Sequence, residues 1–194
     1  MPDLETLTGL FHDSPSELGE FDEVSADEMP AAYRQLLAHN AHMTVTVERF
    51  HNSPVDVRVL DKRVSATHYA RKILLARQTD GQVVQFGIMR VNLAYLSPEV
   101  QQEIQAEKIP LGRVLIQHNV LTRVQLFSLW RIVLGEELQQ VFELPADSVT
   151  YGRTAMIDCD GVPAVELLEI VTPPRAGEDR VTAAGRAQPV KGPE

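Results

Sequence analysis

Charged residues stand inside three otherwise apolar, strand-like segments of this sequence. Arg71 lies in HYARKILLA, Arg153 in TYGRTAMI and Glu169 in AVELLEIVTPP. In a half-buried strand alternate residues share a face, so Arg71 lies with Ile73, and Glu169 lies with Leu167. A guanidinium on an apolar face needs an anionic partner, because burying a charge alone is costly. Two interpretations stay open: these residues bind an anionic ligand, or they are structural, as an internal Arg–Glu salt bridge or as arginines at the solvent edge of the sheet.

The segment KIPLGRVLIQHN, residues 108–119, places a stiff, an apolar and a flexible residue before a helix-like run. In one interpretation Pro110 and Gly112 only mark the boundary between two helices. In the other, Pro110 fixes the approach of the chain, Leu111 offers its backbone N–H to a small anion, and Gly112 allows close contact because it has no Cβ. Both interpretations stay open on the residues of this segment alone.

Composition excludes several classes of function. The 194-residue chain has one cysteine, Cys159, which rules out an internal disulfide and a cysteine-based metal cluster. The scattered histidines indicate no metal site, and there is no Gly-rich phosphate loop. No basic cluster predicts nucleic-acid binding, and no apolar run approaches the ~20 residues of a membrane helix. The acidic N-terminus lacks the features of a secretory signal, so we expect a cytoplasmic protein without membrane insertion.

The distribution of charge divides the chain into three parts. Residues 1–29 contain nine Asp or Glu and no Lys or Arg, which predicts a disordered acidic leader; a regulatory tail is the alternative. Residues 175–194 are rich in Gly, Ala, Pro and charge, which predicts a disordered tail. The folded domain is therefore expected at residues 30–174.

Alternating apolar residues predict that most of this domain is an antiparallel sheet of about six strands. Turns are expected at Asp80-Gly81 and Asp160-Gly161, and a helix is expected to begin after Ser97. Inserted helices among consecutive strands predict an α+β fold. The strand-like segments are 43–51, 55–64, 68–78, 83–93 and the two halves of 149–174, and the helix-like segments are 29–42, 97–108 and 135–145. The segment 122–134 is ambiguous, although its β-branched and aromatic residues favour a strand.

The segments HMTVTVERF, YARKILL, IPLGRVL, YGRTAMI and GVPAVELLEIVTPP, in this order, resemble the chorismate lyase (chorismate pyruvate-lyase) family, including the actinobacterial 4-hydroxybenzoate-forming type. The resemblance covers about residues 33–174 and rests on the combination of motifs. It implies a six-stranded antiparallel sheet whose helical insertions close over a buried ligand. It also implies a lyase that converts chorismate to 4-hydroxybenzoate and pyruvate without a metal or an organic cofactor.

The same resemblance assigns roles to individual residues. Arg71 matches the arginine that holds the ring carboxylate, and Glu169 matches the carboxylate that faces the ring hydroxyl. A register error would exchange Glu169 with Glu166, which lies on the opposite face of the strand. Thr154 stands where the enterobacterial type has a second basic residue, which leaves the exact substrate open. The implied substrate-binding residues are Met43, Leu111, Gly112 and Arg153, the first two through their backbone N–H groups.

Two other functions remain open beside the chorismate lyase. The first is a non-catalytic sensor of small aromatic acids, because the same architecture occurs in effector-binding domains of transcription regulators. The second is a lyase that gives a different hydroxybenzoate. The presence of both Arg71 and Glu169 favours catalysis, since a sensor needs only an anion clamp. The sequence predicts neither the pathway, quinone or phenolic, nor the oligomeric state.

Overall fold

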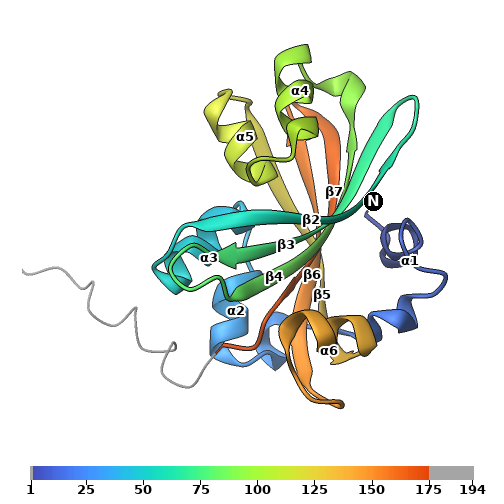
Figure 1. Ribbon diagram of the computed structural model, residues 1–194, viewed down its shortest axis with the longest axis vertical. Coiled ribbons are helices and arrows are strands. Elements are labelled where there is room, and N and C mark those ends of the chain that lie inside the picture. The colour runs from blue at the N-terminus through green and yellow to red at the C-terminus, as the bar shows by residue number, and fades with distance from the viewer. Residues whose placement is uncertain (1, 175–194) are drawn as a thin grey trace, which may run out of the picture.

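A computed structural model of the protein describes residues 2–174 and is built around one antiparallel sheet (Figure 1). The seven strands lie in the order β1-β5-β6-β7-β4-β3-β2, so β1 and β2 form the two edges. The expected α+β fold with an antiparallel sheet is confirmed. The strands are β1 (Gly19–Val24), β2 (Val55–Val64), β3 (His68–Arg77), β4 (Val83–Asn92), β5 (Thr122–Leu134), β6 (Val149–Cys159) and β7 (Val162–Val171).

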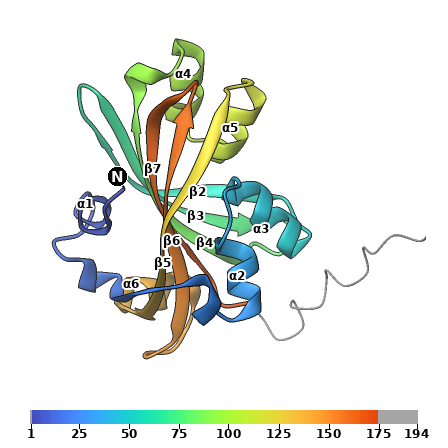
Figure 2. The same ribbon diagram turned by 180° about the vertical axis from the view of Figure 1, so that it is seen from behind.

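Helices cover both faces of the sheet, as the two opposite views in Figures 1 and 2 show. The helices are α1 (Leu4–Thr8), α2 (Ala31–Leu37), α3 (Met43–His51), α4 (Pro98–Ala106), α5 (Leu111–Gln117) and α6 (Glu136–Phe142), with short 3₁₀ turns at Pro15–Glu17, Ala26–Glu28 and Leu93–Tyr95. We call the side covered by α2, α3, α4 and α5 the four-helix face, and the side covered by α1 and α6 the two-helix face. No helix in residues 2–174 has the length and apolar character needed to cross a membrane.

Turn and cap residues place most elements where the sequence predicts them. Gly81, with φ +74°, turns β3 into β4, and Asp160 and Gly161, both with positive φ, turn β6 into β7. The side chain of Ser97 accepts a hydrogen bond from the backbone N–H of Val100 and so caps α4. The segment 122–134, which the sequence leaves ambiguous, is the strand β5.

The prediction of a disordered leader has to be corrected, because residues 2–29 are folded onto the sheet. β1 pairs along its length with β5, from Gly19 opposite Leu134 to Val24 opposite Leu129. Leu7 and other apolar leader residues pack in the core of the two-helix face. The acidic side chains of the leader point mostly to solvent, whereas several of its apolar side chains are buried. The acidic composition of the leader therefore does not reveal these buried positions. The folded domain therefore includes residues 2–29 and does not begin at residue 30, while the predicted tail at 175–194 lies outside the described residues.

The predicted strand at residues 43–51 is also wrong, because this segment forms the helix α3. Its β-branched residues suggest a period of two, but Met43, Val47 and Phe50 are spaced by four and three and share one helical face. These three side chains are buried against the sheet, whereas Val45 is 39% exposed. β2 consequently pairs with β3 rather than with this segment.

Candidate functional site

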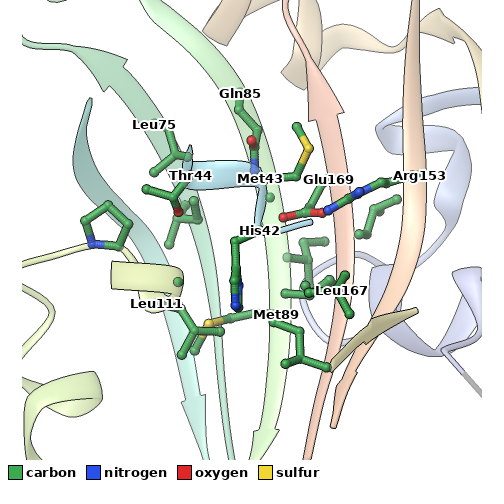
Figure 3. Close-up of a pocket in the computed structure, with 18 residues that line it drawn as sticks. His42, Met43, Thr44, Leu75, Gln85, Met89, Leu111, Arg153, Leu167 and Glu169 are labelled. Carbon is green, nitrogen blue, oxygen red and sulfur yellow. The ribbon is translucent and has the colours of Figure 1, made fainter. Parts of the chain in front are cut away.

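A cavity of about 50 Å³ lies between the four-helix face of the sheet and the starts of α3 and α5 (Figure 3). It sits where the apolar core under α2 and α3 meets the apolar core under α4 and α5. An engineered cavity of about 150 Å³ binds benzene, so a ring needs more room than this cavity offers in the structure. The polar residues of its lining are His42, Thr44, Gln85, Arg153 and Glu169, and the apolar ones include Met43, Ile73, Leu75, Met89, Leu111, Val124, Ile157 and Leu167.

Two helix starts form the side of the cavity that faces the sheet. α3 begins at Met43 and α5 at Leu111, and no side chain caps either start. The first N–H groups of a helix have no acceptor within the helix and carry partial positive charge. A Cβ at Gly112 would lie 3.2 Å from Thr44 Oγ1 and 3.4 Å from His42 Nδ1, so the glycine allows the two starts to approach closely. This side of the cavity therefore offers backbone donors.

The short connection between α4 and α5 explains where α5 begins. α4 ends at Ala106, and its C-cap residue Glu107 has a left-handed φ of 60° that breaks the helical path. Pro110 precedes Leu111 in an extended conformation, with φ −58° and ψ 144°, so its ring sets the direction from which the chain enters α5. The side chain of Leu111 is buried at the cavity wall. The Pro-Leu-Gly segment thus marks a helix boundary and also shapes the cavity.

Arg153 and Glu169 form a buried ion pair between the neighbouring strands β6 and β7. The two residues are directly opposite in the register, and Arg153 Nε donates to Glu169 Oε2 at 2.7 Å. The Arg153 Nη groups donate to the backbone carbonyls of His39, at 2.8 Å, and Ala41, at 3.1 Å. Both side chains line the cavity, but the guanidinium is directed at protein acceptors. Arg153 therefore holds the loop that leads into α3.

Arg71 is buried on the four-helix face but has few partners. The residue is 1% exposed, its Nη1 donates weakly to the Ile104 carbonyl at 3.4 Å, and its Nε has no partner within residues 2–174. Burial lowers the pKa of Arg71, and the nearby Tyr69 and Glu107 oppose this shift. Arg71 lies outside the cavity lining, yet Met89, its direct neighbour on β4, lines it. The guanidinium is thus adjacent to the cavity and turned toward the end of α4.

The two glutamates of β7 lie on opposite faces of the sheet, as the alternation of the strand predicts. Glu169 reaches the cavity, whereas Glu166 pairs with Arg90 on β4. Met43, Leu111 and Gly112 also line the cavity. The predicted positions therefore converge on one site, with Arg71 directly beside it.

Two residues of the site were missed by the sequence analysis. Gln85 on β4 is 3% exposed, lines the cavity, and has an Oε1 without a hydrogen-bond partner in the described part of the chain. A polar residue in the apolar run VVQFGIMR is the same signal that marks Arg71, so it could have been found. His42 Nε2 lies 2.9 Å from Thr122 Oγ1, and burial together with the charge of Arg153 lowers its pKa. Residues 2–174 contain no group of three or more His, Cys, Asp or Glu placed to bind a metal ion.

No protein-family model matches this sequence, and no curated protein is significantly similar to it. The fold is similar to that of a possible transcriptional regulator, YydK from Bacillus subtilis, with a TM-score of 0.51 and 17% identity over 88% of this chain and 84% of that chain. It is also similar to the effector domain of PhnF from Mycobacterium smegmatis, with a TM-score of 0.51 and 8% identity over 68% of this chain and 88% of that domain. At such identities the likeness shows the fold alone, which is the chorismate-lyase-like fold.

Proposed function

We propose that this domain binds a small, ring-bearing carboxylic acid in the cavity and acts as a ligand-sensing domain. The observation that carries the proposal is an apolar cavity between uncapped helix starts and a sheet that presents buried polar groups, one of them unpartnered. A carboxylate accepts hydrogen bonds from the free N–H groups of a helix start, where the helix dipole also favours an anion. Apolar walls with a few placed polar groups are typical of sites for small organic ligands.

The size of the cavity supports sensing rather than simple storage of a ligand. About 50 Å³ is too little for a six-membered ring, so a bound acid would move the starts of α3 and α5 away from the sheet. A ligand that binds one of two arrangements more tightly shifts the population toward it, and a sensor works by such a shift. The likeness to an effector domain and to a possible regulator is in keeping with this function.

A second candidate function is the lyase that the sequence resemblance implies. In that reaction the ring loses its C4 proton, the C3–O bond breaks with its electron pair going to oxygen, and the released enolpyruvate takes up a proton to become pyruvate, which leaves the aromatic 4-hydroxybenzoate. Positioning and electrostatic stabilisation are able to carry most of such a reaction. The carboxylate of Glu169 in the cavity wall favours this candidate, because a pure anion clamp has no need of it. Two features favour sensing over the lyase. Glu169 is bonded to Arg153, and Arg71 is directed toward α4, so both side chains face protein groups and not a reacting ligand.

One pair of experiments tests both candidates. The purified protein is titrated with 4-hydroxybenzoate by calorimetry, and a coupled assay follows pyruvate release from chorismate. Binding without pyruvate release above the uncatalysed rate is the result that the sensing function predicts. Release of pyruvate together with 4-hydroxybenzoate would replace sensing by the lyase. Neither binding nor turnover would contradict both.

A further inference from the structure

Within residues 2–174, the amide of Gln85 is a buried polar group of the cavity wall whose hydrogen bonding is incomplete. Gln85 is 3% exposed in the middle of the sheet, and its Oε1 has no donor within residues 2–174. Figure 3 shows its amide directed into the cavity that Glu169 also enters. Native proteins satisfy nearly all buried acceptors, so an orphaned one in a cavity wall calls for an explanation.

The neighbours of Gln85 do not supply the missing donor. Directly across the sheet lie Leu75 on β3 and Val171 on β7, and both side chains are apolar. The cation in the cavity wall, Arg153, gives its N–H groups to Glu169 and to the loop before α3. An amide held this way is set to accept a hydrogen bond from a molecule that enters the cavity.

The two sides of the cavity differ in hydrogen-bonding character. The start of α3 at Met43 presents backbone N–H groups, which are donors. The sheet presents the Gln85 amide oxygen and the Glu169 carboxylate, which are acceptors. A complementary ligand carries its acid group toward the start of α3 and a hydroxyl or amino group toward the sheet.

We infer that Gln85 determines ligand specificity by accepting a hydrogen bond from a hydroxyl or amino group of the bound acid. This inference rests on the proposed binding of a ring acid in the cavity. Acids that carry such a donor are preferred over acids in which it is absent or methylated. The preference arises because a donor-free ligand would leave the buried Gln85 oxygen unpaired and also dry.

The test compares 4-hydroxybenzoate, 4-aminobenzoate, 4-methoxybenzoate and benzoate by calorimetric titration. We expect the wild-type protein to bind the hydroxy and amino acids at least about tenfold more tightly than the other two, the value of one well-placed hydrogen bond. Gln85→Met keeps the size of the side chain and removes the acceptor, so the four acids should then bind within about threefold of one another. The matched control is Gln125→Met, because Gln125 on β5 bonds to Asp158 away from the cavity.

Measurements without ligand separate this role from a structural one. Because Gln85→Met removes an unsatisfied buried acceptor, its thermal unfolding midpoint without ligand should equal or exceed that of the wild type. Equal binding of all four acids by the wild type would overturn the role of Gln85 and leave the proposed function standing. Unchanged preference in Gln85→Met would do the same. Failure of the wild type to bind any of the four would overturn the proposed function itself.

Discussion

The two faces of the sheet bury different kinds of side chain at their centres. The two-helix face buries leucine, isoleucine and phenylalanine side chains, and its buried Thr8 and His12 lie in and after α1, where His12 and Lys72 contact Glu137. The four-helix face buries charged and amide groups in its centre, although burying such groups costs stability. These groups are Arg71, Gln85, Arg153 and Glu169. We place the ligand on the four-helix face, where these polar groups are buried at a cost in stability.

The two arginines of the four-helix face sharpen this comparison. Arg153 is surrounded by protein acceptors, whereas Arg71 has one weak hydrogen bond and an Nε without a partner in residues 2–174. Both are nearly inaccessible to solvent, so burial alone does not separate them. What separates a structural from a ligand-binding arginine is the list of acceptors that the fold already provides.

Arg153→Met should have the largest effect on stability. It leaves the Glu169 carboxylate buried without its cation and leaves the His39 and Ala41 carbonyls without donors, so unfolding free energy should fall by about 3–5 kcal/mol. Denaturant unfolding measures the loss. Arg131→Met is the matched control, because the solvent-exposed pair of Arg131 with Asp22 contributes about 1 kcal/mol or less. Similar losses for the two variants would contradict the distinction between the centre and the rim.

Leu7→Ala should cost nearly as much, although it lies in the acidic leader. Leu7 is fully buried in the core of the two-helix face, and truncating such a leucine costs about 2–5 kcal/mol. The control is Val64→Ala, because Val64 is exposed on the edge strand β2 and should change stability by less than about 0.5 kcal/mol. A Leu7 effect as small as that of Val64 would show that the leader contributes nothing to the core.

The rim of the two-helix face should make stability depend on pH. Burial raises the pKa of Glu137, but hydrogen bonds from Lys72 and His12 outweigh it, so the pKa lies below its ordinary value. A carboxyl with a lowered folded-state pKa stabilises the fold above its unfolded pKa of about 4.3, and this contribution disappears as pH falls through the folded-state value. Glu137→Gln should therefore destabilise at pH 7 and have a shrinking effect below about pH 5. An effect that is constant from pH 7 to pH 3 would contradict this.

Arg71→Met should have the smallest effect on the unliganded protein. The substitution removes a desolvated cation that makes one weak backbone hydrogen bond and a side-chain contact with Tyr69, and the nearby Glu107 keeps its ion pair with Lys62. Unfolding free energy should therefore stay within about 1 kcal/mol of the wild type or rise. Denaturant unfolding beside Arg153→Met makes the comparison direct. A loss of 3 kcal/mol or more, on the order expected when a buried pair is broken, would show that Arg71 is structural like Arg153.

Local patterns in the sequence predict the strands β2 to β7 and the separation of Glu169 from Glu166, because alternation and turn residues act over short distances. The leader and α3 could not be read in this way. The leader is ordered by pairing with β5, more than a hundred residues later. The sequence of α3 fits both the period of a strand and that of a helix, and packing against the sheet decides in favour of the helix. The roles of Arg71 and Arg153 are equally hidden, since both stand in apolar strands. The register of β6 with β7 and the position of the loop before α3 are needed to see that Arg153 already has acceptors within the protein.

The central claim, that the cavity of the four-helix face is the ligand site, is tested most directly by filling it. Gly87 lines the cavity, and a Cβ there would make ordinary contacts of 3.5 Å with Ile73 Cδ1 and the Leu168 carbonyl. Gly87→Ala should therefore leave the thermal midpoint of the unliganded protein unchanged or higher, since alanine reduces the conformational freedom of the unfolded chain. Calorimetric titration with 4-hydroxybenzoate should show binding to the wild type and a loss of at least about tenfold in the variant, the equivalent of about 1.4 kcal/mol. Equal affinity of the two proteins would place the ligand elsewhere and contradict the claim.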